Sequence, residues 1–264
     1  MCYDISFRVK MGDLASYFPE LIVDEQLNLD FESVHVIGHN YPPHPIIYRN
    51  RDDGKLHCRA MEWGCIPYYI KEEETFIKQR ASMLNARAER VLEDSKSYWY
   101  KIKDRRCLVP VSAIYEHRSV KGWKKKVPYL IKLKDQEIFF IPGLYSVAEV
   151  VNKETGELSK IWSFTIITRT ANEVMQLIHN DGENKFRMPL FLPQQLSIKF
   201  LNRELPIADY QEILGYEMPS SNLEYWPVYT IRSNIERPDS AEKDAAWEWE
   251  NLPPLGMEIQ KSLF

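Results

Sequence analysis

Short apolar runs rich in β-branched and aromatic residues recur along the chain, and this pattern constrains its fold more than any other. The runs cover residues 45–48, 108–115, 128–133, 138–141, 161–168 and 226–231. Runs of this length favour strands, and the helical patterns between them follow no regular strand–helix–strand alternation. We therefore expect an α+β fold, built mainly on antiparallel or mixed β-sheet as a barrel-like single domain with inserted short helices.

Helix signals and one hairpin signal refine this expectation. Helices are predicted at residues 72–83, 171–178, 192–201 and 207–214. The first has acidic residues at its start and basic ones near its end, and the second follows Thr168 and Thr170 as candidate N-caps. Alternating residues 129–134 predict a strand with one face in solvent, and 138–141 predict its hairpin partner.

The bulk properties indicate one folded unit. The chain has 264 residues, 44% of them hydrophobic, with no composition shift that divides it. We expect a catalytic domain over residues 1–235 and an acidic, Pro- and Trp-bearing arm of the same domain over 236–264. Four cysteines without CxxC spacing, and histidines at no metal-ligand spacing from them, predict a reduced protein with no structural metal and no cofactor.

No leader opens the chain and no apolar run approaches the length of a membrane span, so we expect a cytoplasmic monomer that does not engage membranes. The net charge of −4 does not by itself indicate a nucleic-acid partner. Residues 96–134, however, hold twelve Lys and Arg against two acidic residues, with aromatics between them. That combination suits single-stranded nucleic acid, although composition alone favours a solvated Lys-rich hairpin.

The second residue is a cysteine, and removal of Met1 would make it the N-terminus. Cys2 would then carry an α-amine and a thiol on adjacent carbons. The amine condenses with an aldehyde to an imine, and the thiol closes on the same carbon to form a thiazolidine ring. Because the two groups ordinarily titrate near ~8 and ~8.5, both are partly reactive at neutral pH.

Three further segments have the polar content of a site. Residues 85–89 place Asn85, Arg87 and Glu89 at alternate positions, which share one face of an extended backbone. Glu116 ends an apolar strand, where burial would raise the pKa of its carboxyl group and suit it to proton transfer. His179 follows the predicted helix over 171–178.

Taken in order, these segments resemble the SRAP family, the abasic-site processing proteins also called SOS response-associated peptidases. The similarity runs from Met1-Cys2 to about residue 192. It rests on Trp63-Gly64-Cys65-Ile66-Pro67, Asn85-Ala86-Arg87-Ala88-Glu89, Arg106-Cys107-Leu108-Val109-Pro110 with Tyr115-Glu116, Lys126-Val127-Pro128-Tyr129, Pro142-Gly143-Leu144-Tyr145, Phe164-Thr165-Ile166-Ile167-Thr168, and Ile178-His179 with Arg187-Met188-Pro189.

The resemblance implies a function. The chain would bind single-stranded DNA at a site that has lost its base, and Cys2 would form a thiazolidine with the C1′ aldehyde of the opened sugar. The adduct would shield the lesion in the DNA damage response, placing the protein on the nucleoid. The peptidase label refers to autocatalytic removal of Met1.

The resemblance also implies residue roles. His179 would assist sugar ring opening, Glu116 would transfer protons and Asn85 would position the N-terminal residue. Arg87 and Arg187 would hold phosphates. Trp63 and Pro67 would stack or wedge bases, and Thr168 completes the DNA-binding set.

The chain departs from the family pattern at three places. Tyr3 and Asp4 replace the common Gly-Arg, and an acidic group here would repel DNA. His117 replaces an aromatic residue after Tyr-Glu. Seven residues, 180–186, separate His179 from Arg187 where one is usual, and we expect them to bulge outward and leave both residues in place.

Two other functions remain open from the sequence. Cys2 with its own amine as base would suit an N-terminal-nucleophile peptidase or amidohydrolase. Alternatively, the basic region 96–134 would make the chain a non-covalent nucleic-acid-binding module in which Cys2 is incidental.

Overall fold

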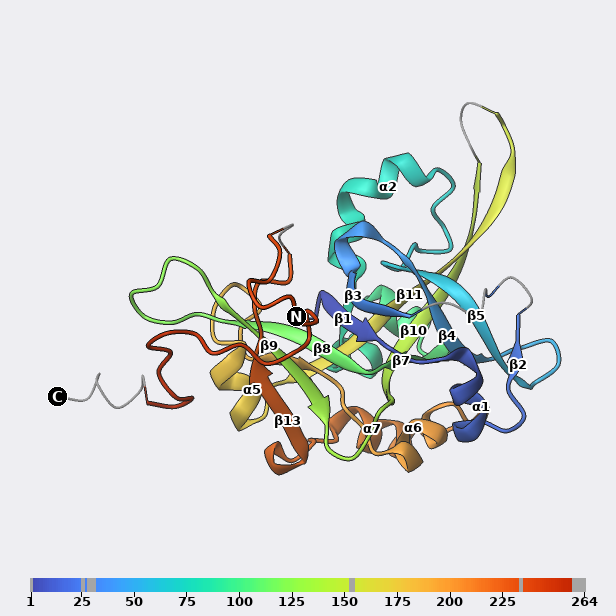
Figure 1. Cartoon of the computed structure of the whole chain (residues 1–264). Coiled ribbons are helices and arrows are strands. Elements are labelled where there is room, and N and C mark those ends of the chain that lie inside the picture. Colours follow the sequence, from blue (N-terminus) through green and yellow to red (C-terminus); the bar gives the residue numbers. More distant parts are fainter. Residues whose placement is uncertain (1, 25–26, 28–31, 152–154, 233–234, 258–264) are drawn as a thin grey trace.

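The two longest strands, β10 (Phe139–Val151) and β11 (Leu158–Thr170), pair antiparallel from Gly143↔Ile166 to Val151↔Leu158. Figure 1 shows this hairpin extending beyond the rest of the protein. The structure is a computed structural model and describes residues 2–24, 27, 32–151, 155–232 and 235–257. Its β-rich, mixed architecture confirms the α+β prediction.

The remaining strands are short. They are β1 (Asp4–Phe7), β2 (Ile22–Val23), β3 (Ser33–Ile37), β4 (Pro43–Arg49), β5 (Leu56–Trp63), β6 (Asn85–Arg87), β7 (Arg106–Val111), β8 (Ala113–Arg118), β9 (Val127–Leu133), β12 (Arg187–Pro189) and β13 (Leu223–Pro227). The helices are α1 (Leu14–Tyr17), α2 (Glu73–Arg80), α3 (Glu89–Leu92), α4 (Tyr98–Lys101), α5 (Glu173–Ile178), α6 (Gln194–Phe200) and α7 (Ile207–Gly215).

Five strands close into a barrel. Antiparallel neighbours run in the order β5, β4, β7, β10 and β11, and a parallel pairing of β11 with β5 at Ser163↔Glu62 closes the ring. Gly143 permits the close approach of these strands, because a Cβ there would lie 2.5 Å from the Thr165 carbonyl oxygen. The barrel prediction is thus confirmed, and the ring fixes the position of everything attached to it.

A second sheet has the order β13-β9-β8-β1-β3. The chain passes from the barrel into it at Ser112, between β7 and β8, where the Ser112 N–H donates to the Ser6 carbonyl at 2.8 Å. The predicted single strand over 108–115 is therefore two strands in two sheets. β8 lies beside β1 (Figure 1). This crossing therefore carries Glu116 next to the residues that precede Asp4.

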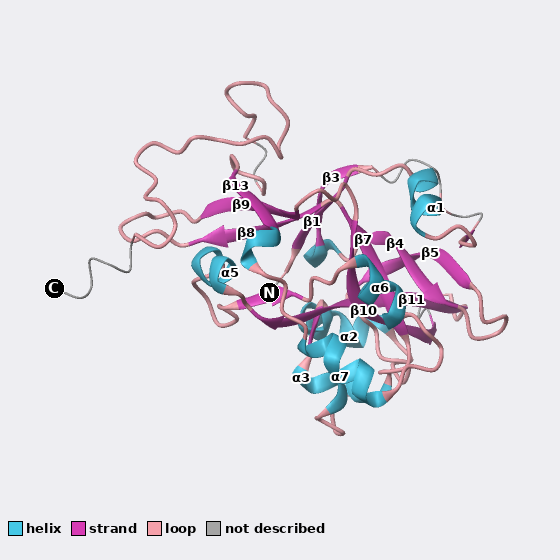
Figure 2. Cartoon of the chain, turned by 90° about the horizontal axis from the view of Figure 1, so that it is seen from below, coloured by secondary structure: helices cyan, strands magenta, loops and turns pink. Residues whose placement is uncertain are grey.

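The helices cover opposite sides of this framework. Figure 2 shows α3, α6 and α7 grouped on one side, while α5 lies near β8. Alternate residues of β4 explain the layering, since Ile47 packs in the cluster with Phe200 and Ile213, and Ile46 packs in the cluster with Ile114 and Trp63. The period of two along a strand produces these two faces.

Two local predictions were wrong. β9 and the start of β10 do not form a hairpin: β9 pairs with β8 and β13, and β10 pairs with β7 and β11. The alternation of 129–134 correctly indicated a strand but could not identify its partner. Helix α5 is capped by Asn172, whose side chain accepts from the Met175 N–H at 3.0 Å, because Thr168 and Thr170 belong to β11.

The segment after β13 packs along the second sheet although it forms no long element. Trp226 Nε1 donates to the Asp244 carbonyl at 2.8 Å, and Trp249 Nε1 donates to the Val228 carbonyl at 2.9 Å. Arg118 donates to the Pro253 carbonyl at 2.8 Å. These contacts hold the described part of the C-terminal arm against β8 and β13.

Candidate active site

Strand pairing brings Cys2 and Glu116 together. β1 runs antiparallel to β8 with Asp4 opposite Tyr115, so the residues just before Asp4 lie beside Glu116. Cys2 is fully buried, and Glu116 is 5% exposed. Burial raises the pKa of the Cys2 thiol well above its usual value, and the charges of Glu116 and Asp4 raise it further. The side chain of Cys2 is therefore a neutral, protonated thiol at pH 7.

Glu116 has the properties of a proton-transfer group. Burial raises the pKa of its carboxyl group to about 7. Its Oε1 has no hydrogen-bond partner among the described residues. A carboxyl group with a pKa near neutrality is populated in both protonation states, so it can accept and donate protons at pH 7.

Asn85 holds the peptide group that joins Cys2 to Tyr3. It lies on β6, which runs parallel to β11 with Asn85 opposite Ile166, and its Nδ2 donates to the Cys2 carbonyl at 2.9 Å. The buried Oδ1 of the same side chain has no partner in the described structure. Asn85 thus places an acceptor in the same buried region as Cys2.

His179 ends helix α5 and is neutral at pH 7. Burial lowers the pKa of its imidazole to about 4. Its Nδ1 lies 2.8 Å from the Arg187 carbonyl oxygen. Because a carbonyl only accepts, Nδ1 carries the proton, and the lone pair is on Nε2. The imidazole is therefore set up as a base.

Glu116 and His179 line one cavity of about 340 Å³. The other lining residues are Tyr3, Asp4, His117, Lys126, Asp181, Gly182, Glu183, Asn184 and Arg232. Cys2 lies buried outside this set, next to Tyr3 in the chain. The predicted acid–base groups thus share one hollow beside the buried thiol.

The insert 180–186 does not separate His179 from Arg187, because His179 Nδ1 still lies 2.8 Å from the Arg187 carbonyl oxygen. The Phe186 N–H donates to the His179 carbonyl at 2.8 Å, which closes the loop at its base. Asn180 anchors one side through two hydrogen bonds to the Ser119 backbone, of 2.8 and 2.9 Å. The loop does not turn away from the site, however, because four of its residues form one wall of the cavity.

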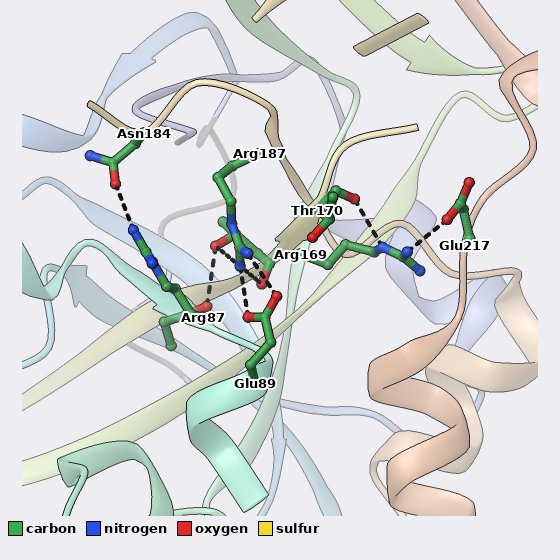
Figure 3. A network of polar contacts seen from close by, with 9 residues as sticks. Arg87, Glu89, Arg169, Thr170, Asn184, Arg187 and Glu217 are labelled. Carbon is green, nitrogen blue, oxygen red and sulfur yellow. Dashed lines mark hydrogen bonds and ion pairs between the residues drawn. The ribbon is translucent and has the colours of Figure 1, made fainter. Parts of the chain in front are cut away.

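The two predicted phosphate-binding arginines differ in availability (Figure 3). Arg87 is exposed, and its Nη2 donates to Asn184 Oδ1 at 3.2 Å. The Arg187 side chain is only 11% exposed and binds both carboxylate oxygens of Glu89, at 2.7 and 3.0 Å, as well as the Thr168 carbonyl. Arg87 is accessible to a ligand. Arg187, on β12, instead links this strand to α3 through Glu89 and to β11 through Thr168.

Three residues predicted to contact DNA are buried in this structure. Trp63 is 0% exposed, stacks on Phe164 and donates its Nε1–H to the Leu84 carbonyl at 3.0 Å. Pro67 is buried. Thr168 is 0% exposed, and its hydroxyl donates to the Ala86 carbonyl. In this structure none of the three side chains is presented at the surface to stack on a base.

The basic region 96–134 is also partly structural. Arg106 and Arg118 are buried and donate to backbone carbonyls, including Phe200 and Pro253. Tyr115 is fully buried. Composition could not separate these residues from the exposed lysines, because Lys and Arg side chains serve both surfaces and cores.

Arg232 lines the cavity although no sequence motif predicted it. Its Nε donates to Asp4 Oδ1 at 3.0 Å and its Nη2 to Asp4 Oδ2, across 228 positions of sequence. Asp4 Oδ1 also accepts a hydrogen bond from His35 Nε2 at 2.8 Å. In this structure the charge of Asp4 is therefore buried and paired.

The described residues contain no cluster of three or more His, Cys, Asp or Glu able to hold a metal ion. Within the same residues, no helix has the length and apolar character needed to cross a membrane. All four cysteines are free and buried.

Comparison with known proteins decides the family. The model of the SOS response associated peptidase (SRAP) family matches residues 1–234. The chain belongs to the SRAP family. The SRAP match covers every strand and helix described above and every predicted site residue, including the segment that carries Arg232.

Curated relatives and solved structures agree with this assignment. Abasic site processing protein YoqW of Bacillus subtilis is 30% identical over 83% of this chain and 91% of its own length. Abasic site processing protein YobE of the same organism is 30% identical over 87% of this chain and 96% of its own length. A crystal structure from Bacteroides thetaiotaomicron, 28% identical, has a TM-score of 0.70 and covers 86% of this chain and 92% of its own. The fold is therefore that of these relatives.

Proposed function

We propose that this SRAP protein processes abasic sites in single-stranded DNA by forming a covalent thiazolidine adduct through Cys2. The observation that carries the proposal is the meeting of Cys2, which precedes β1, with Asn85 of β6 and Glu116 of β8, beside a cavity that His179 also lines. Curated relatives that cover most of this chain are named abasic site processing proteins. The partner is a DNA strand carrying the lesion.

The first step is removal of Met1, which consumes one water molecule and frees the α-amine of Cys2. Glu116, with a pKa near 7, is suited to take a proton from the attacking group and return it to the leaving amine. We include this autocatalytic peptidase step in the proposal because the liberated amine is required for everything that follows.

Adduct formation then proceeds in two bond-forming stages. The neutral His179 accepts a proton from the C1′ hydroxyl as the C1′–O4′ bond of the deoxyribose breaks, and returns it to O4′, which leaves the C1′ aldehyde and a C4′ hydroxyl. The Cys2 amine adds to C1′, and loss of water, with a proton supplied by Glu116, gives the imine. The Cys2 sulfur adds to the imine carbon while its proton passes to nitrogen. The sum is aldehyde plus aminothiol giving thiazolidine plus water.

Burial of the thiol is compatible with this order of events. A thiol whose pKa is raised is a poor nucleophile toward other electrophiles, which protects it until the imine forms next to it. The basic carboxylate of Glu116 then assists its deprotonation. The exposed Arg87 lies on the same short strand as Asn85, so a phosphate held there would align the sugar with the N-terminal residue.

The test uses protein whose Met1 removal is confirmed by intact mass. It is mixed with a single-stranded oligonucleotide containing one abasic site, or with the same strand containing a tetrahydrofuran analogue that cannot open to an aldehyde. We expect an adduct that survives denaturing electrophoresis with the abasic strand alone, at the summed mass minus one water. Cys2→Ala should lose the adduct and keep reversible binding.

Other outcomes would support the other functions. Adduct formation by Cys2→Ala would place the chemistry elsewhere and refute the proposal. Turnover of peptide or amide substrates without a DNA adduct would indicate an N-terminal-nucleophile hydrolase. Equal reversible binding of both strands with no covalent species would indicate a non-covalent nucleic-acid-binding module.

A further inference from the structure

We propose that Arg232 is a phosphate-binding residue of this site, holding a backbone phosphate next to the lesion, and that Asp4 orients its guanidinium for that contact. The inference rests on the proposed function, since it assigns the ligand to the same DNA strand. It concerns a residue far in sequence from the motifs that identify the family.

Arg232 is held in place by the packing of the residue before it and by an ion pair of its own side chain. The preceding residue, Ile231, is 3% exposed and packs with Tyr115 and Leu130 under the second sheet. The side chain of Arg232 is 45% exposed, whereas Asp4, its partner, is 2% exposed. The arginine therefore extends from a buried anchor across a buried carboxylate, and its outer part reaches solvent in the cavity wall.

The ion pair with Asp4 uses only one edge of the Arg232 guanidinium and leaves N–H donors on the other edge for a ligand. Asp4 accepts from Nε and Nη2, which together form one edge of the guanidinium plane. The group has five N–H donors in a rigid fork, so the edge formed by Nη1 and Nη2 still carries donors directed away from Asp4. Such an edge matches a phosphate in bidentate geometry, and the paired edge holds it at a fixed angle.

Four acidic side chains and two cationic ones line the cavity. A phosphate held here would therefore have to contact one of the two cations. Lys126, the other cationic side chain of the lining, is bound by Asp181 at 2.9 Å. Arg232 is paired with a carboxylate that His35 also contacts, so the charge of Asp4 is shared between two partners. A phosphate bound by Arg232 would lie in the same cavity as Glu116 and His179, the groups proposed to act on the adjacent sugar.

Arg8 provides a matched control. Its side chain is 44% exposed and its Nη1 binds Asp244 at 2.8 Å, so it also joins the start of the chain to the C-terminal segment. It follows β1, whereas Asp4 begins it, and Arg8 does not line the cavity. Removing Arg8 changes the net charge and one comparable ion pair without touching the proposed phosphate site.

The experiment measures reversible binding of the tetrahydrofuran oligonucleotide by fluorescence anisotropy, at several salt concentrations, in a Cys2→Ser background. Arg232→Gln keeps a hydrogen-bond donor for Asp4 and removes the charge. We expect about tenfold weaker binding and a slope of log K against log salt that is shallower by about 0.7, the value for one phosphate contact to a single strand. Arg232→Lys should restore most of the slope, and Arg8→Gln should leave it unchanged.

An unchanged slope in Arg232→Gln, an equal change in Arg8→Gln, or the absence of reversible binding by the parent protein would overturn the inference. The covalent assay separates it from the proposed function. A normal adduct with an unchanged salt slope means that Arg232 is not a phosphate ligand although the Cys2 chemistry stands. A shallower slope in protein that never forms an adduct means that the phosphate site exists and the Cys2 chemistry does not.

Discussion

Glu116→Gln should stabilise the protein at alkaline pH while abolishing efficient adduct formation. Burial raises the pKa of Glu116 from its usual 4.5 to about 7. Between these two pH values the folded protein binds more protons than the unfolded chain, so stability falls as pH rises through this window and levels off above it. At about 1.4 kcal/mol per pH unit, the full effect is roughly 3 kcal/mol.

The glutamine has a similar shape and no charge at any pH, so its stability does not carry this contribution. The two proteins should therefore differ little near pH 4, and the variant should be about 3 kcal/mol more stable near pH 8. Other titrating groups, such as Asp4 and His179, are present in both proteins and largely cancel in the difference.

The assay is urea denaturation of both proteins across pH 4 to 8, with the same N-terminal state confirmed by intact mass. The quantity of interest is the change with pH of the difference in unfolding free energy. A constant difference would refute the reasoning, because it would mean that Glu116 titrates normally in the folded protein. The rate of adduct formation, measured in parallel, should fall in the variant at every pH.

Two further predictions test the supporting residues. Trp63→Ala should lower the unfolding free energy by about 3–5 kcal/mol, since it empties a buried indole site, while reversible DNA binding by the folded fraction stays unchanged; weakened binding without destabilisation would restore a surface role for Trp63. Asn85→Ala should slow adduct formation about tenfold by releasing the Cys2 carbonyl, with the affinity for the tetrahydrofuran strand preserved; an equal rate in variant and parent would show that this hydrogen bond does not position the nucleophile.

The local patterns in the sequence predicted several elements well. The helix predicted at 207–214 is α7, and the run over 161–168 lies within β11. Both are encoded by neighbouring residues, because periodicity and capping act over a few positions. The nearness of Cys2, Asn85 and Glu116 could be expected only through the family resemblance, as no local rule joins residues that far apart.

The sequence by itself determined the chemical groups that the chain can offer: a thiol at Cys2, a carboxyl group at Glu116 and an imidazole at His179. Only the tertiary structure decided which side chains meet and which face solvent. It buried Trp63 and Thr168, paired Arg187 with Glu89, and joined Asp4 to Arg232 across nearly the whole chain. Burial and long-range ion pairing depend on how strands from distant segments are arranged, and that arrangement leaves no local signal in the sequence.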